Sequence, residues 1–282
     1  MTAICIARDP SSSSHPRPSA FICGPMPTYR AIPSFYDDEY ADLHMLQRDV
    51  GWLMSRLPRR ASDVLMLACG TGRAAIPIAQ AGHRVVGVDI DEAMLAIARA
   101  KAEFAGLSMK QLEFECHDLL TMKPSRRFDS AAILFNSFLM FTTLEEQDRV
   151  LSNVYQSLKP RGRLFIDVFN PDLAQIAERD VKNADLRFFL SRELGVGVQR
   201  TTHIHATHRP QVRETVFEYR WFDANGRAKK RVVKFELTYL FPRELTILLE
   251  RNEFEVVSIS GDYDGRAVSP DCERLLVEAR KR

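Results

Sequence analysis

The stretch Val64-Leu-Met-Leu-Ala-Cys-Gly-Thr-Gly-Arg73 decides how this chain folds. Its first five residues are apolar, which predicts a buried strand over residues 64–68, and the glycines that follow predict a tight turn into a helix. Backbone N–H groups at the start of such a helix can approach a ligand closely, because glycine has no side chain in the way. The turn at Gly70 and Gly72 therefore predicts one wall of a ligand-binding site.

Strands and helices alternate on both sides of this turn. A helical pattern over residues 34–57 comes first, with Ser34 and Asp37 at capping-box spacing, and Pro58 ends it. The expected strands are residues 64–68, 85–89, 112–116, 130–135 and 163–169, and the expected helices between them are residues 73–81, 91–104 and 143–158. Alternation of this kind indicates a doubly wound α/β fold with a mostly parallel sheet.

The pattern changes after Pro171. Residues 196–241 predict antiparallel strands, and Asn225-Gly226 predicts a type I′ hairpin between strands at residues 215–222 and 232–241. A helix over residues 243–252 and strands near residues 255–259 and 274–278 then return to the core. We therefore expect a flexible leader (1–33), an α/β core (34–195), an inserted antiparallel cap (196–241) and the final helix and strand pair of the core (242–282).

Composition narrows the class of protein. Hydrophobic residues make up 45% and charged residues 27%, and the formal net charge is +2. The only dense basic cluster is residues 229–231, so we expect no nucleic-acid partner. No apolar run reaches the roughly 18 residues that a membrane span needs. The five cysteines have no CxxC spacing, which favours a cytoplasmic protein without disulfides or a zinc site.

Polar residues follow four of the predicted strands. Glycines follow the first strand, Asp89 ends the second, Asp118 follows the third and Asn136 follows the fourth. Because the carboxyl ends of parallel strands meet at one edge of a sheet, these residues are expected to line one cleft. Asp89 comes about twenty residues after the glycine turn, where a carboxylate can bind both hydroxyls of a ribose. The loop also fits Gly-x-Gly-x-x-Ala through Ala75, so a dinucleotide-dependent oxidoreductase is an alternative.

In order and spacing these motifs resemble the class I S-adenosylmethionine-dependent methyltransferase superfamily over residues 34–282. Residues 68–72 resemble its first motif, 86–89 its second, 117–119 its adenine-contacting turn and 158–163 the loop before its fifth strand. The resemblance implies a seven-stranded sheet whose last strand is antiparallel. It also implies S-adenosylmethionine as cofactor, S-adenosylhomocysteine as product, and in-line methyl transfer to a nitrogen or oxygen of a small molecule.

The resemblance implies roles for single residues too. Asp89 would bind the ribose, Asp118 would take the adenine amino group, and the backbone of the glycine turn would face the methionyl part. The full set of expected cofactor-binding residues is Tyr36, Tyr40, Arg48, Ala68, Gly70, Gly72, Asp89, Ile90, Met94, Asp118, Leu119 and Asn136.

Candidate catalytic residues come from the first helix and the cap. Tyr36, Tyr40 and His44 are spaced four apart and share a helix face. Tyr36-Asp-Asp-Glu-Tyr40 resembles the start of small-molecule N-methyltransferases, in which a tyrosine hydroxyl lies near the sulfonium methyl; tyrosines that only pack the helix edge are the alternative. We take Tyr40, His44 and His203 as candidates, with His203 as a general base in the acceptor pocket. The three histidines at 203, 205 and 208 do not converge on a strand, so no metal site is expected.

Two features leave alternatives open. Met66 stands where the family usually carries an acid that helps to hold the cofactor ammonium, so a cofactor-binding protein with little activity is a further alternative. The aromatic residues of the cap, among them Phe217, Tyr219 and Tyr239, predict either a lid over the acceptor or the interface of a homodimer.

Overall fold

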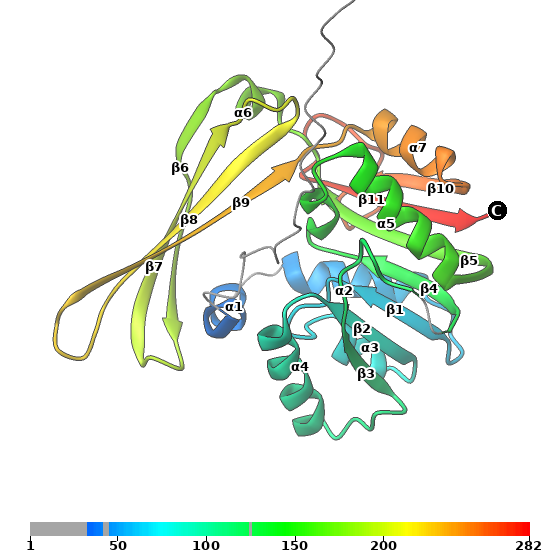
Figure 1. Cartoon of the computed structure of the whole chain (residues 1–282), viewed down its shortest axis with the longest axis horizontal. Coiled ribbons are helices and arrows are strands. Elements are labelled where there is room, and N and C mark those ends of the chain that lie inside the picture. The colour runs from blue at the N-terminus through cyan, green and yellow to red at the C-terminus, as the bar shows by residue number, and fades with distance from the viewer. Residues whose placement is uncertain (1–32, 42–44, 124–125) are drawn as a thin grey trace, which may run out of the picture.

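The computed structural model of the protein describes residues 33–41, 45–123 and 126–282. Within these ranges the chain forms a seven-stranded sheet with helices on both faces and a four-stranded sheet beside it (Figure 1). The leader predicted over residues 1–33 lies outside the described residues except for Pro33, and so does the candidate residue His44.

The larger sheet has the strand order β10-β11-β5-β4-β1-β2-β3. Its strands are β1 (Asp63–Leu67), β2 (Arg84–Asp89), β3 (Leu112–Cys116), β4 (Phe128–Ile133), β5 (Leu158–Phe169), β10 (Phe254–Gly261) and β11 (Arg274–Lys281). β11 runs antiparallel to β5 and β10, and the other neighbours are parallel. The predicted fold class is confirmed. β5 begins earlier than predicted, because Leu158 already pairs with Phe128.

Alternate residues of β1 belong to two separate cores, one on each face of the sheet. Leu65 and Leu67 pack with α5 (Leu144–Ser157) and α7 (Pro242–Arg251). Val64 and Met66 pack on the other face, whose helices are α2 (Met45–Arg56), α3 (Ala75–Gln80) and α4 (Glu92–Phe104). Neighbouring side chains of a strand point to opposite faces, so a strand buried on both faces is apolar throughout.

Two predicted helix starts are confirmed by their hydrogen bonds. Asp91 caps α4 by accepting from the N–H of Ala93 at 2.9 Å. Thr143 and Glu146 form the reciprocal capping box of α5. Both caps fix where a helix leaves the carboxyl edge of the sheet, which is the edge that the motifs line.

The first helix differs from the prediction, because the pattern over residues 34–57 forms two helices. α1 covers Pro33–Tyr40, Ala41 lies in a turn, and α2 begins at Met45. The two helices pack on different parts of the molecule: Phe35 belongs to the core of the smaller sheet, whereas Leu53 belongs to the core of the larger one. Apolar spacing alone could not reveal this division. α1 lies between the two sheets (Figure 1).

The cap is an antiparallel sheet of four strands in the order β6-β7-β8-β9, with β6 (Asp180–Ser191), β7 (Val196–Ala206), β8 (Val212–Phe222) and β9 (Ala228–Thr238). It begins before residue 196, where we had expected it, since β6 belongs to it; the short helix α6 (Leu173–Ala177) precedes β6. β6 escapes a pattern search because its outward residues are apolar: Leu186, Phe188 and Leu190 are 52%, 70% and 64% exposed.

The turn between β8 and β9 is not the predicted type I′ turn, which requires a positive φ at both central residues. Gly226 has a φ of +72°, but Asn225 is not among the residues with positive φ. The Asp223 carboxylate instead accepts from the N–H groups of Asn225 and Arg227, at 2.9 and 3.0 Å. The side chain of Asp223 thus holds a longer turn than the dipeptide signal indicates.

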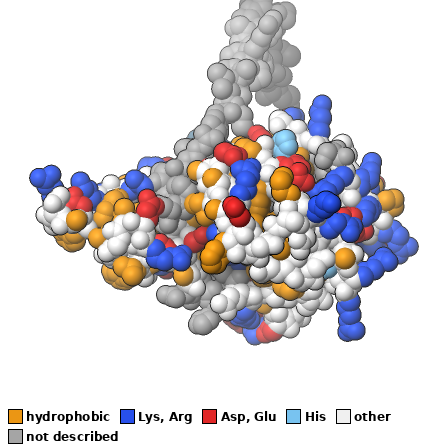
Figure 2. Space-filling model, turned by 90° about the horizontal axis from the view of Figure 1, so that it is seen from below, with side chains coloured by type: hydrophobic (Ala, Val, Ile, Leu, Met, Phe, Trp, Pro, Cys, Tyr) orange, Lys and Arg blue, Asp and Glu red, His pale blue; other side chains and the backbone are white. Residues whose placement is uncertain are grey.

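The cap end of the molecule carries apolar side chains among charged ones (Figure 2). Phe188 and Phe222 are the most exposed of its aromatic residues, at 70% and 66%. The predicted homodimer is not tested by this surface and stays a prediction. Among the described helices, none has the length and apolar character needed to cross a membrane.

Candidate functional site

A cavity opens at the carboxyl edge of β1, β2 and β3, and we call it the core cavity. Its lining residues are Tyr36, Ala68, Gly70, Asp89, Ile90, Asp91, Met94, His117, Asp118, Leu119, Ser137, Met140 and Phe141. Eight of the twelve expected cofactor-binding residues are in this set: Tyr36, Ala68, Gly70, Asp89, Ile90, Met94, Asp118 and Leu119. The ends of neighbouring strands thus bring these eight residues together, as expected. That they bind a cofactor stays a prediction.

Asp89 joins the glycine turn to the second strand end. The N–H of Gly70 donates to its Oδ2 at 2.7 Å, and the N–H of Asp91 donates to its Oδ1 at 3.0 Å. Burial raises the pKa of Asp89, and the two backbone hydrogen bonds act in the opposite direction. Each carboxylate oxygen has a second lone pair, so the side chain can accept a pair of vicinal hydroxyls as well.

Asp118 and the apolar residues near it form the neighbouring wall. The N–H of Leu120 donates to Asp118 Oδ1 at 2.9 Å, which fixes the carboxylate at the end of β3. Leu119 and Met94 are 6% and 3% exposed and also line the cavity. An apolar slot that ends in a fixed carboxylate can hold a flat heterocycle with an exocyclic amino group.

A second cavity of about 400 Å³ lies under the cap sheet, and we call it the cap cavity. It is lined by residues of α6, of all four cap strands and of the ends of β4 and β5. Tyr40, Asn136, Arg200, Phe217 and Tyr239 are among its lining residues. The two cavities share three lining residues, Tyr36, Ser137 and Met140. A group held in one cavity therefore borders a group held in the other.

α1 supplies the tyrosines at this junction. The rings of Tyr36 and Tyr40 lie 4.9 Å apart, and Tyr40 contacts Phe135 at 5.3 Å between ring centroids. Burial raises the pKa of Tyr36 to about 12, so its hydroxyl keeps its proton at neutral pH. Tyr36 can donate a hydrogen bond or orient a ligand there, but it cannot serve as a base.

Acidic residues of α1 connect the helix to both sides of the site. Asp37 accepts from the Thr71 hydroxyl at 2.6 Å and pairs with Lys101 at 2.9 Å, which ties α1 to the glycine turn and to α4. Glu39 accepts from Arg200 at 2.6 Å and from the Tyr219 hydroxyl at 2.7 Å, which ties α1 to the cap. The helix therefore bridges the walls of both cavities.

The end of β4 has an unusual backbone. Phe135 and Asn136 have φ values of +54° and +66°, in the left-handed region that non-glycine residues rarely adopt. Asp167 holds this turn, since the N–H of Phe135 donates to its Oδ2 at 3.1 Å. Asn136 Oδ1 accepts from the N–H of Phe169 at 2.8 Å. Hydrogen bonds from the surrounding structure therefore fix two strained residues at the cavity wall. Strained residues held in place like this are typical of functional sites.

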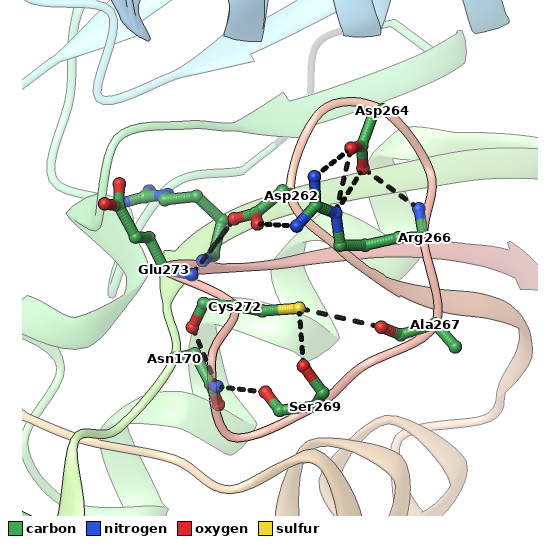
Figure 3. A network of polar contacts seen from close by, with 9 residues as sticks. Asn170, Asp262, Asp264, Arg266, Ala267, Ser269, Cys272 and Glu273 are labelled. Carbon is green, nitrogen blue, oxygen red and sulfur yellow. Dashed lines mark hydrogen bonds and ion pairs between the residues drawn. The ribbon is translucent and has the colours of Figure 1, made fainter.

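A polar network in the loop between β10 and β11 supports the same wall (Figure 3). The Asn170 amide lies between two carbonyl groups of this loop and donates to Ser269 and Cys272, both at 3.0 Å. Asp262 accepts from the N–H groups of Glu273 and Arg274 at 3.0 and 3.1 Å. Arg274 itself lines the cap cavity and pairs with the buried Asp167 at 2.6 Å. The loop thereby fixes the residue that holds the β4 turn.

Several predicted residues do not lie where we expected. Gly72 lines neither cavity; a Cβ at that position would meet Phe114 at 3.0 Å, so this glycine serves close packing. Arg48 is exposed and also lines neither cavity, and its guanidinium lies 5.4 Å from the Tyr263 ring. Tyr40 and Asn136 line the cap cavity rather than the core cavity.

His203 is not placed to act as a base. Its strand neighbours Thr202 and Ile204 line the cap cavity, and His203 does not. Alternate side chains of a strand point to opposite faces, so His203 lies on the outer face of the cap. Its Nδ1 there accepts from the N–H of Asn183 at 3.4 Å. The described residues contain no histidine, cysteine and acid cluster that could hold a metal.

Sequence reasoning also missed part of the site. Ser137 and Met140 lie on a 3-10 turn (Ser137–Met140) directly after the strained residues, and no motif marks them. Arg200 and Thr202 were missed because the inward face of β7 could not be chosen without its register. Tyr219, expected as a lid residue, is fully buried against Phe35 and does not line the cap cavity.

Known proteins resemble the chain in both sequence and fold. Residues 64–162 match the model of a methyltransferase domain family. A demethylmenaquinone methyltransferase from Thermus thermophilus is 36% identical over 133 residues, which are 46% of this chain and 56% of that relative. A cypemycin N-terminal methyltransferase from a Streptomyces species is 25% identical over 253 residues, which are 87% of this chain and 97% of the relative. A solved S-adenosylmethionine-dependent methyltransferase from Clostridium acetobutylicum has a TM-score of 0.71 at 18% identity. The match covers 90% of this chain and 98% of that protein, and at this identity it supports the fold alone.

Proposed function

Because this chain belongs to the class I S-adenosylmethionine-dependent methyltransferases, we propose that it moves a methyl group from S-adenosylmethionine to a nitrogen or oxygen of a small molecule held under the cap. The proposal assigns the core cavity to the cofactor and the cap cavity to the acceptor. The observation that carries it is the junction of the two cavities at Tyr36, Ser137 and Met140.

The residues of the core cavity fit the cofactor. Asp89 has lone pairs left for two ribose hydroxyls after its bonds to backbone N–H groups. Ile90, Met94 and Leu119 supply an apolar slot for the adenine, with Asp118 at its end. Met66 itself is 2% exposed and brings no charge to the site. Two acids are tied to the glycine turn, Asp37 through Thr71 and Asp49 through Arg73, so the ammonium end would depend on these acids or on carbonyl groups of the turn.

The bound cofactor would supply an electrophilic methyl carbon on a positively charged sulfur. An acceptor lone pair would form the new bond to this carbon, the electron pair of the carbon–sulfur bond would remain on sulfur, and the acceptor would lose a proton. The chain has to align the acceptor and exclude water, which α1 and the cap sheet do by closing the cap cavity. No histidine lies in the wall of the cap cavity as described, so the proton would pass to water or to an acid such as Asp172.

One specific observation favours a second candidate, a cofactor-binding protein with little activity. Met66 packs in the apolar core on the α2 side of the sheet in place of the expected acid, and the buried Asp49 of α2 is already paired with Arg73 at 2.6 Å. The dinucleotide alternative has no comparable support, since the closing strand β11 is antiparallel, as the methyltransferase resemblance requires.

Calorimetric titration of the full chain with S-adenosylhomocysteine and, side by side, with NAD tests the proposal. We expect micromolar binding of S-adenosylhomocysteine at one site per chain and no measurable heat from NAD. Tight NAD binding without a response to S-adenosylhomocysteine would overturn the assignment of the core cavity. Screening with methyl-labelled S-adenosylmethionine and a panel of amines and phenols then separates an active enzyme from a binding protein.

A further inference from the structure

Two residues on the same face of β7, separated by one residue in the sequence, each have a buried polar atom without a hydrogen-bond partner. In the part of the chain that the structure describes, four buried side-chain nitrogen or oxygen atoms lack a partner, and two of them are Arg200 Nε and Thr202 Oγ1. Arg200 is 3% and Thr202 6% exposed, and both line the cap cavity. A buried polar group left unpaired destabilises a protein, so such a pair in a cavity wall indicates a ligand that satisfies both.

The rest of the Arg200 guanidinium is already engaged. Its Nη1 donates to Glu39 at 2.6 Å, its Nη2 pairs with Asp185, and its plane lies 4.3 Å from the centre of the Phe217 ring. Arg187 also pairs with Asp185, at 2.7 Å. Two acids and two arginines therefore balance in charge, and Arg200 Nε remains as a donor within a neutral cluster.

This balance selects the kind of group that can bind there. A carboxylate or phosphate at this point would add a negative charge beside Glu39 and Asp185, whose two arginines are already paired. The other arginines that line the cavity are also engaged, Arg213 with main-chain carbonyl groups and Arg274 with Asp167. A neutral oxygen satisfies Arg200 Nε–H and the Thr202 hydroxyl without that cost. The same wall also offers the apolar side chains of Phe217, Phe235 and Leu237.

We propose that the acceptor carries, apart from its methylated atom, a neutral carbonyl or hydroxyl oxygen on an apolar ring, and that Arg200 and Thr202 bind this oxygen. The inference rests on the proposed function in assigning the cap cavity to the acceptor. It adds two residues that determine specificity and excludes acceptors whose buried end is anionic.

The test uses a matched pair of probes, acetophenone and benzoate, which share a phenyl ring and differ in the charge of the carbonyl group. Ligand-observed NMR titration of the full chain, with S-adenosylhomocysteine present, gives both dissociation constants. We expect acetophenone to bind at least about tenfold more tightly than benzoate, because only the anion adds a buried charge. Equal binding, or tighter binding of benzoate, would overturn the proposal.

Thr202→Val removes the hydroxyl at nearly constant shape. Because the hydroxyl has no partner in the free protein, the melting temperature should stay the same or rise, while acetophenone binding weakens about fivefold. Thr202→Ser should keep wild-type binding. Thr201→Val, on the opposite face of the same strand, is the matched control and should leave both probes unaffected.

Unchanged acetophenone binding in Thr202→Val, or a lower melting temperature, would show that the hydroxyl has a structural role instead. Titration of the same variants with S-adenosylhomocysteine separates the two proposals. Failure of the wild type to bind S-adenosylhomocysteine would contradict the proposed function alone, and loss of the acetophenone preference would contradict the acceptor class alone.

Discussion

At the scale of single residues, the environment of a side chain decides its chemistry more than its identity does. Asp89 and Met66 lie on the neighbouring parallel strands β2 and β1. The methyltransferase resemblance implies an acid at both positions. Asp89 meets backbone donors at the open edge of the sheet, whereas Met66 is enclosed on the α2 face by residues such as Phe165. A carboxylate would therefore be stabilised at position 89 and destabilised at position 66.

Met66→Glu should consequently lower the free energy of unfolding by about 3–5 kcal/mol, because the new carboxylate would be buried without a cation. Urea unfolding measures this loss, and Met66→Leu, which conserves volume, should cost less than about 1.5 kcal/mol. If Met66→Glu kept wild-type stability and bound S-adenosylhomocysteine more tightly, an ammonium site within reach of β1 would have to exist.

Tyr36 gives a prediction about alkaline pH. Burial raises its pKa to about 12 in the folded protein, whereas an unfolded chain titrates near the ordinary value of 10.0. The folded state thus holds the proton more tightly, so the stability contribution is complete below pH 10 and is lost as pH rises through 12. Tyr36→Phe should make the decline of unfolding free energy between pH 10 and 12 shallower, as urea titrations at several pH values would measure. A decline as steep as in the wild type would place Tyr36 in contact with water.

Site residues could be predicted from the sequence where the sheet topology fixes their position, and not where strand register or distant contacts fix it. Gly70, Asp89 and Asp118 follow from strand ends, because the topology alone brings those ends together. His203 could not be assigned correctly, since one step of register moves a side chain to the opposite face of the cap. The partners of Arg200, Glu39 and Asp185, lie on α1 and β6, and no local sequence signal marks Arg200 or Thr202.

At the scale of elements, α1 connects the core cavity with the cap cavity. Its residues reach the glycine turn through Asp37 and the cap through Glu39, and its tyrosines line both cavities. The sequence predicted a helix here, but not its end at Tyr40, because the apolar spacing continues through residues that pack elsewhere. The β6 strand was missed because its outward residues are apolar, while two of its inward residues, Asp185 and Arg187, are charged and pair with each other.

Loss of the α1 contact with the cap should be costly. Glu39→Ala leaves Arg200 buried with Asp185 alone and removes the acceptor of the Tyr219 hydroxyl, so we expect a loss of roughly 3 kcal/mol in unfolding free energy. Glu214→Ala is the control in the same sheet, because Glu214 forms only an exposed pair with Lys234 and should cost less than about 1 kcal/mol. Similar losses in the two variants would mean that the buried cluster does not hold α1 in place.

At the scale of the whole molecule, the larger sheet and the cap form two adjoining cavities, and we propose that the first holds the cofactor and the second the acceptor. The mostly parallel sheet was predicted from the alternation of strands and helices, and the antiparallel closing strand was implied by the family resemblance. A lid over the acceptor was one of two predictions for the cap, but its attachment through α1 could not be predicted, since it depends on contacts such as Arg200 with Glu39. A homodimer stays a prediction, which the mass from light scattering tests.

The most direct test of this division is the dissociation constant of S-adenosylhomocysteine for three proteins: the wild type, Asp89→Asn in the core cavity and Tyr239→Ala in the cap cavity. The account predicts that Asp89→Asn weakens binding by about tenfold or more, because charge-assisted bonds to the ribose are lost. Tyr239→Ala should stay within about threefold of the wild type, because Tyr239 lines only the cap cavity. An unchanged constant for folded Asp89→Asn, or an equal loss in Tyr239→Ala, would contradict the assignment of the core cavity to the cofactor.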